Sequence, residues 1–141
     1  MSAKTASWLD TSAILALFLA EPGYETVRSL IAEAGAGQRT VCLSQISLLE
    51  IAASVMREYG EPVAREDLRL LAELPIQVRA PTDADCIAAG FLRAQHRLST
   101  ADAIIATQAR QLDAELVHKD PEFESVPGLR QHRLPYKPRR R

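Results

Sequence analysis

Residues 7–23, SWLDTSAILALFLAEPG, contain the change of pattern that decides the fold. The apolar run at 7–9 is typical of a short buried β-strand, and residues 12–20 form an apolar segment of helical length. Pro22 and Gly23 then stop the helix. Asp10 stands between the two elements. The segment therefore predicts a strand followed by a helix, with an acidic side chain at their junction.

The same alternation continues along the rest of the chain. Strands are predicted at 40–43, 76–79, 114–118 and 130–134, and helices at about 23–34, 45–59, 62–74, 82–96 and 101–112. Ser44, Thr82 and either Ser99 or Thr100 are suited to cap the helices that follow them. Strands that alternate with helices indicate an α/β fold with a mostly parallel sheet flanked by helices.

The length and composition indicate one soluble domain. The chain has 141 residues, of which 47% are hydrophobic and 25% charged, as in ordinary globular proteins. We expect a domain at 1–135 and a basic tail at 136–141. No apolar run reaches the length of a membrane span and the N-terminus lacks the pattern of a signal peptide, so we expect a cytoplasmic protein without a membrane contact.

The charge is divided unevenly between the body and the tail. The net charge is −1, but Lys137 and the three arginines at 139–141 leave 13 basic against 18 acidic residues in 1–136, a net charge of −5. The tail could bind RNA phosphates, or it could be a solvated end. The acidic body discriminates weakly between functions, because metal-binding carboxylates raise the acid count by themselves.

The two cysteines, Cys42 and Cys86, fit neither a disulfide framework nor the spacing of a zinc site. Each lies among apolar residues in the sequence, so both are expected to be buried as small hydrophobic side chains.

Four acidic residues stand out by their position next to predicted elements: Asp10, Glu50, Asp102 and Asp120. Each has a structural interpretation when it is taken alone. Asp10 could cap a helix, and Glu50 could form a capping box with Ser47. Asp102 could interact with a helix dipole, and Asp120 before a proline is common in turns.

Taken together, the four acids predict a metal site. Loops that leave the carboxyl ends of parallel strands gather along one edge of a sheet, where such folds bind ligands. Carboxylates collected in a partly desolvated pocket repel one another unless a cation is present. Ligation by oxygen alone favours Mg²⁺ or Mn²⁺ over zinc, and such an ion could activate a water for hydrolysis of a phosphodiester.

Four motifs carry a resemblance to the PIN-domain ribonucleases. They are LDTSA at 9–13, SQISLLEIA at 44–52, LSTADAIIATQA at 98–109 and LVHKDPEF at 116–123. Their order and spacing are similar to the family over residues 8–134. The acids at the matching positions are Asp10, Glu50, Asp102 and Asp120.

The resemblance implies a fold, an activity and partners. It implies a single domain with a mostly parallel, five-stranded sheet and RNA cleavage that depends on Mg²⁺ or Mn²⁺. The four acids would be the catalytic residues and metal ligands. A chain this short looks most like the VapC-type toxins of type II toxin–antitoxin pairs, which implies an antitoxin partner and frequent homodimers.

His118 departs from the family pattern, which usually has Thr or Ser two residues before the last acid. His118 could assist the site because it would point the same way as Asp120 in a strand, but packing at the strand end is the preferred interpretation. Thr11 and Ser12 could orient Asp10 or bind substrate. Asp83 and Asp85 are expected in the first turn of a helix. His96 and His132 have no predicted partner.

Two other functions are compatible with a small α/β domain. A receiver-type signalling domain would use an aspartate as phosphoacceptor, and Lys119 would suit it. It also needs an acidic pair after the first strand, where Asp10 stands alone. A non-catalytic PIN-like binding module is the second alternative, and the presence of all four acids argues against it.

For the antitoxin, an acid cluster could receive an inserted arginine. A partner helix could pack on an apolar stripe formed by Val27, Leu30, Ile31, Leu68 and Leu71, or this stripe could face the chain's own core.

Overall fold

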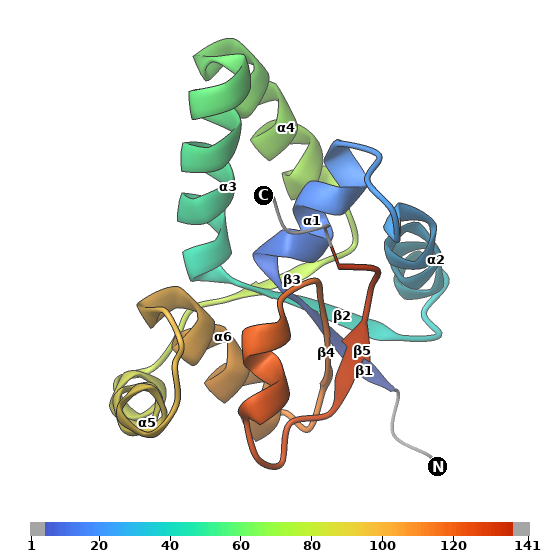
Figure 1. Ribbon diagram of the computed structural model, residues 1–141. Helices are drawn as coiled ribbons and strands as arrows, with labels where there is room; N and C mark the ends of the chain where they lie inside the picture. Colours follow the sequence, from blue (N-terminus) through green and yellow to red (C-terminus); the bar gives the residue numbers. More distant parts are fainter. Residues whose placement is uncertain (1–4, 137–141) are drawn as a thin grey trace.

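Strands and helices alternate along the chain in the computed structural model, which describes residues 5–136 (Figure 1). The strands are β1 (Ala6–Leu9), β2 (Thr40–Ser44), β3 (Gln77–Arg79), β4 (Glu115–His118) and β5 (Gln131–Arg133). The α-helices are α1 (Thr11–Phe18), α2 (Tyr24–Gly35), α3 (Gln45–Tyr59), α4 (Glu61–Glu73), α5 (Asp83–Gln95) and α6 (Thr100–Gln111), and a 3₁₀-helix, η1, spans Pro121–Ser125.

The five strands form one parallel sheet in the order β3-β2-β1-β4-β5. β1 lies at the centre, with Leu9 paired to Leu43 of β2 and to Val117 of β4. The predicted α/β class and parallel sheet are confirmed. Receiver domains have the strand order 2-1-3-4-5, so the receiver alternative is wrong. Because all strands run the same way, their carboxyl ends meet at one edge.

Two helical layers cover the sheet because alternate strand residues point to opposite faces. Trp8 packs against α5, α6 and η1 on one face. Leu9 packs against α1, α2, α3 and α4 on the other. In Figure 1 the α3–α4 hairpin rises beyond the sheet, and α5 and α6 lie on the side away from α1 and α2.

Most predicted helix starts are confirmed by their capping contacts. Ser44 caps α3, and Ser99, not Thr100, caps α6 with its hydroxyl accepting from the Asp102 N–H. Thr82 and Asp85 form a capping box at the start of α5. The suggested box between Ser47 and Glu50 is wrong, because α3 already begins at Gln45.

The apolar stripe proposed for a partner helix faces the core. Val27, Leu30, Ile31 and Leu71 are buried, and Leu68 packs against the same cluster. The interpretation that the stripe faces the chain's own core is therefore confirmed, and the stripe is not a docking surface. The large apolar side chains that are exposed on the α3–α4 hairpin are different ones: Leu49, Met56, Tyr59, Val63 and Leu70.

Cys42 is buried as expected, but Cys86 is exposed, because its position in α5 faces away from the sheet. Both are free thiols. None of the helices formed within residues 5–136 has the length and hydropathy of a membrane span. The basic residues of the predicted tail, 137–141, lie outside the described residues, and the division at 135/136 stays a prediction.

Candidate active site

The predicted acids lie at the carboxyl edge of the sheet or on helices that start there. Asp10 follows β1 and caps α1, and its backbone N–H still donates to Val117 of β4 (3.0 Å). Asp120 lies two residues beyond β4 and caps η1. Asp102 is in the first turn of α6, and Glu50 is near the start of α3. Parallel strand direction is therefore what places these residues on one side of the molecule.

Asp10 is buried with only half of its carboxylate satisfied. The residue is 4% exposed. Its Oδ2 accepts from both the backbone N–H and the hydroxyl of Ser12. Oδ1 is buried and has no hydrogen-bond partner among residues 5–136. Burial raises the pKa of Asp10 to about 6, against the lowering effect of the Ser12 hydrogen bonds. Such an orphaned oxygen needs a ligand.

The residues after Asp10 hold the acids in place. The Thr11 hydroxyl donates to Glu50 Oε1 (2.6 Å) and lies 2.9 Å from Ser47 Oγ. Ser12 Oγ donates to Asp10 and accepts from the backbone N–H of Lys119 (3.0 Å). Thr11 and Ser12 are thus positioning residues, since one fixes Glu50 and the other fixes Asp10.

Asp102, Asp120 and Glu122 form the closest acidic group, with one carboxylate oxygen of each within 4.8 Å of the others. The pKa of Asp102 is raised to about 8. Burial is the largest cause, and the charges of Asp10, Asp120 and Glu50 add to it. Asp10 and Glu50 thus act on Asp102 electrostatically, although neither belongs to this closest group.

Glu122 joins the acidic group in the structure, although its position in the sequence did not single it out. The 3₁₀-turn that starts at Asp120 brings it back, since the Glu122 N–H donates to Asp120 Oδ1 (2.9 Å). The signal was a second acid two residues after Asp120, followed by Phe123, which is fully buried and anchors the turn.

His118 supports the backbone of the site and does not face the acids. Its Nδ1 accepts from the Asp120 N–H (3.0 Å), and Nε2 therefore donates to Gln131 Oε1 (2.9 Å). The ring is fully buried against Phe123, at 4.9 Å between centroids. Burial lowers the pKa of His118, so the ring is neutral at pH 7. This is the packing role preferred from the sequence.

Lys119 is almost fully buried next to the acids. Its Nζ donates to the carbonyl of Pro22 (3.0 Å) and lies 3.9 Å from Glu21 Oε1. The ammonium therefore ties β4 to the loop between α1 and α2.

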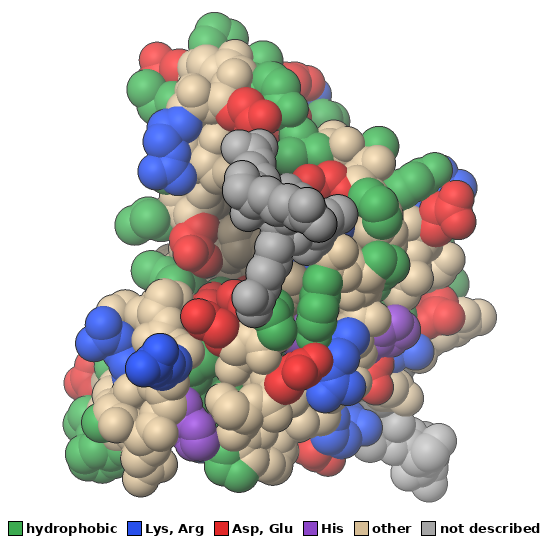
Figure 2. Space-filling view, in the orientation of Figure 1, with side chains coloured by type: hydrophobic (Ala, Val, Ile, Leu, Met, Phe, Trp, Pro, Cys, Tyr) green, Lys and Arg blue, Asp and Glu red, His purple; other side chains and the backbone are tan. Residues whose placement is uncertain are grey.

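A pocket of about 640 Å³ opens beside Asp10 and Asp120. Its apolar wall includes Leu15, Leu19 and Pro121, and its polar wall is completed by residues of α3, the α1–α2 loop and Lys119. Acidic side chains lie around the middle of the face shown in Figure 2. The pocket gives an extended, partly apolar ligand access to the carboxylates.

The donor set fits a hard divalent cation. It consists of carboxylate oxygens, with an orphaned oxygen on Asp10 and three acids whose oxygens approach within 4.8 Å. The one histidine close to them, His118, has both ring nitrogens engaged. Oxygen ligands without sulfur or imidazole suit Mg²⁺ or Mn²⁺.

Comparisons with known proteins agree with this fold. The sequence matches the PIN domain over residues 8–129. VapBC2 from Rickettsia felis, solved bound to a promoter DNA fragment, is 19% identical, with a TM-score of 0.76 over 93% of this chain and 100% of that one. DNA-bound VapBC from Salmonella typhimurium is 20% identical, with a TM-score of 0.73 and coverage of 92% and 98%.

A third similar structure is VapC20 from Mycobacterium tuberculosis, described as a toxin that cleaves the sarcin–ricin loop. It is 19% identical, with a TM-score of 0.69 over 87% of this chain and 95% of that one. No curated protein sequence matches this chain. The structural likenesses show a shared fold, and the sequence match covers most of the length. The chain belongs to the PIN domain family.

Proposed function

We propose that this protein is a divalent-metal-dependent endoribonuclease and the toxin of a VapC-type toxin–antitoxin pair. The observation that carries the proposal is the buried Asp10 carboxylate, whose free oxygen lies beside an acidic cluster at the carboxyl edge of the sheet. A cluster that raises the pKa of its own members costs stability unless it binds a cation. Family membership supports nuclease chemistry at this edge.

The metal ligands would come from the five acids of the site: Asp10, Glu50, Asp102, Asp120 and Glu122. A bound Mg²⁺ or Mn²⁺ supplies an activated water and neutralises charge on the phosphate oxygens during hydrolysis. Ser12 holds Oδ2 of Asp10 and leaves Oδ1 for the ion. Thr11 holds one oxygen of Glu50 and leaves the other to accept a proton or to bind water.

The choice of RNA as substrate rests on the relatives. The similar M. tuberculosis toxin is described as cleaving the sarcin–ricin loop. The 640 Å³ pocket next to Asp120 is wide enough for a nucleotide. The cytoplasm, where RNA is found, is the expected location.

A cognate antitoxin is the proposed partner, because the Rickettsia and Salmonella relatives were solved as VapBC complexes. The exposed Leu49 and Met56 lie two turns apart on one face of α3, the helix that carries Glu50. This face would seat an apolar segment while an arginine reaches the acids. A homodimer stays a prediction.

The nuclease proposal is tested by incubating the purified chain with structured and single-stranded RNA in Mn²⁺, in Mg²⁺ and in EDTA. Cleavage should need the metal and should disappear in Asp102→Asn. Asp113→Asn is the matched control, since Asp113 is an exposed acid in the turn after α6 that pairs with Arg130. Metal binding without cleavage of any RNA would favour the non-catalytic binding module.

The toxin proposal is tested separately with the product of the gene adjacent to this one. That protein should co-purify with the chain and suppress cleavage. Leu49→Asp and Met56→Asp should weaken the complex without changing cleavage by the free enzyme. A neighbour that neither binds nor inhibits would leave a stand-alone PIN nuclease.

A further inference from the structure

A second pocket, of about 390 Å³, lies on the face of the sheet covered by α5 and α6, next to the edge strand β3. It is lined by residues of β1, of β3 and the loop after it, of the start of α5 and of the end of α6. None of the five acids of the proposed nuclease site lines it. Its volume is within the range of small-molecule sites.

Two buried polar groups in this pocket lack partners. Trp8 is 1% exposed, and its indole N–H has no acceptor within the described chain. Gln108 is 5% exposed, and its amide donates to the carbonyl of Arg79 (3.2 Å), which leaves Oε1 buried and unpartnered. Buried polar groups are nearly always paired, so an unpartnered donor and an unpartnered acceptor on two residues that line one cavity point to a polar ligand.

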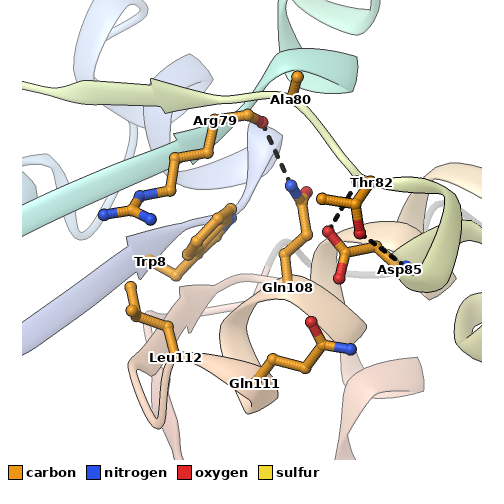
Figure 3. Close-up of a pocket in the computed structure, with 8 residues that line it drawn as sticks. All are labelled: Trp8, Arg79, Ala80, Thr82, Asp85, Gln108, Gln111 and Leu112. Atoms are coloured by element: carbon orange, nitrogen blue, oxygen red, sulfur yellow. Dashed lines mark hydrogen bonds between the residues drawn. The ribbon is translucent and has the colours of Figure 1, made fainter.

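The remaining walls divide the pocket into two sides, as Figure 3 shows. Trp8, Leu112 and Arg79 lie on one side, and Asp85 and Gln111 lie on the other, with Gln108 between them. Asp85 uses one carboxylate oxygen to accept from the Thr82 N–H (2.9 Å). The pocket therefore offers an aromatic and apolar wall opposite a row of carbonyl and carboxylate oxygens.

Arg79 places a positive charge at the mouth. Its side chain is exposed, donates to Oε1 of Gln77 (3.1 Å) and also hydrogen-bonds the Cys42 thiol. In the part of the chain that the structure describes, Arg79 forms no ion pair with a carboxylate. An uncompensated guanidinium at the rim of a pocket is a binding group for phosphate.

We propose that this pocket binds a guanine nucleotide, with the base inside and the phosphate on Arg79. Guanine presents adjacent N–H donors beside a carbonyl acceptor. Gln108 Oε1 and the Asp85 carboxylate would accept from the donors, and the Trp8 N–H would donate to the carbonyl. Adenine and uracil cannot offer two adjacent donors to these oxygens.

The nucleotide could be free or could be one residue of an RNA chain. Arg79 pairs in register with Ser44, the cap of the helix that carries Glu50, so the backbone of this lining residue lies at the carboxyl edge of the sheet. Gln111 and Leu112 lie at the end of α6 opposite to Asp102, so the pocket extends away from the acids. An RNA residue held here would select the sequence that is presented for cleavage. That version rests on the proposed nuclease function, whereas binding of free nucleotide does not.

Trp8 is the single tryptophan of the chain, so its fluorescence reports on this pocket alone. The test titrates the full chain in EDTA with GMP, AMP, UMP, guanosine and inorganic phosphate. EDTA removes any dependence on the metal site. We expect GMP to change the fluorescence at a concentration about tenfold lower than AMP or UMP. Guanosine and phosphate should each bind more weakly than GMP.

Two variants and one control assign the contacts. Arg79→Gln should weaken GMP binding about tenfold without weakening guanosine. Gln108→Leu should reduce the preference for GMP over AMP. If that buried change prevents folding, the exposed Arg79 still provides the test. Arg65→Gln is the control, since Arg65 is an exposed arginine on α4.

The outcomes divide as follows. Tighter binding of a short RNA that contains one guanine than of GMP identifies the RNA residue as ligand, and equal binding identifies the free nucleotide. An unchanged Trp8 signal, equal responses to the three nucleotides or a response to phosphate alone would overturn the proposal. RNA cleavage in Mn²⁺ without any GMP binding would remove this site and leave the nuclease proposal standing.

Discussion

The Ser12 hydroxyl accepts the backbone N–H of Lys119 at 3.0 Å, across 107 positions of sequence. The same hydroxyl donates to Asp10. One small side chain thus joins the start of α1, which follows β1, to the residue after β4. β1 and β4 are neighbours in the sheet. The relative position of Asp10 and Asp120 depends on it.

Ser12→Ala should therefore reduce RNA cleavage more than it reduces stability. The variant leaves the Lys119 N–H without its acceptor and Asp10 with one hydrogen bond fewer, which costs about 1–2 kcal/mol of unfolding free energy. Cleavage should fall about 10- to 100-fold, as for loss of a group that orients a metal ligand. Urea unfolding and single-turnover cleavage measure the two effects. Ser29→Ala, on the exposed surface of α2, is the control.

Asp10→Asn should abolish cleavage and keep the fold. Asparagine can still cap α1, but it is a poor ligand for a hard cation. We expect a loss on the order of 10³-fold in cleavage, with the midpoint of urea unfolding unchanged or higher. A variant that unfolds while the remaining folded fraction cleaves normally would show that Asp10 is only a helix cap.

The metal-free protein should lose stability as the pH rises. The pKa of Asp102 lies at about 8 in the folded protein, above its value of 3.8 in an unfolded chain. The folded state therefore binds the proton more tightly, so its contribution is complete below about pH 4 and is lost as the pH passes 8. Urea unfolding from pH 5 to 9 in EDTA should show this decline. Asp102→Asn should flatten it, and so should saturating Mn²⁺.

Glu122→Gln should weaken metal binding without abolishing it. Glu122 lies within 4.8 Å of the Asp102 and Asp120 oxygens but is exposed, so we expect about a tenfold loss of Mn²⁺ affinity. Calorimetry with Mn²⁺ gives the affinity directly. Glu124→Gln is a close control, because Glu124 lies in the same short helix but binds Arg133 and Tyr136. Equal losses in both variants would place Glu122 outside the metal site.

His118→Ala should destabilise the fold by about 2–4 kcal/mol. It removes a fully buried ring and the acceptor of the Asp120 N–H. The difference in unfolding free energy between the wild type and His118→Ala should shrink as the pH falls through the lowered pKa of His118, because folding excludes the proton from this ring. Thermal unfolding at pH 5 and pH 7 tests both points. His96→Ala, at a less buried histidine, should change neither.

Much of the fold could be predicted because its signals are local. Capping residues such as Ser44 and Thr82 indicate where helices begin, and apolar runs such as 114–118 indicate strands. The strand order could not be read in this way, since it depends on contacts between residues far apart, such as Trp8 with Leu116. The same limit left two interpretations open for the stripe that includes Val27 and Leu71, because a helical stripe has the same sequence pattern whether it faces the core or a partner.

The sequence could predict those acids of the candidate site that come soon after the end of a strand. Asp10 follows β1 directly and Asp120 lies two residues after β4, which is a pattern along the chain. Glu122 was missed because only the 3₁₀-turn after Asp120 brings it back toward Asp102. The hydrogen bond from Thr11 to Glu50 could not be predicted either, since it joins two helices and no sequence pattern in either helix indicates it.

The central position of β1 also has a consequence for synthesis of the protein. A nascent chain carries β1 from the start, but the strand that completes its pairing, β4, ends at His118. A ribosome-bound chain that has not yet released this segment has Asp10 without Asp120 and an open edge in the middle of its sheet. Parallel pairing over such a distance forms late. The proposed nuclease site would therefore be complete only after β4 and Asp120 have left the ribosome.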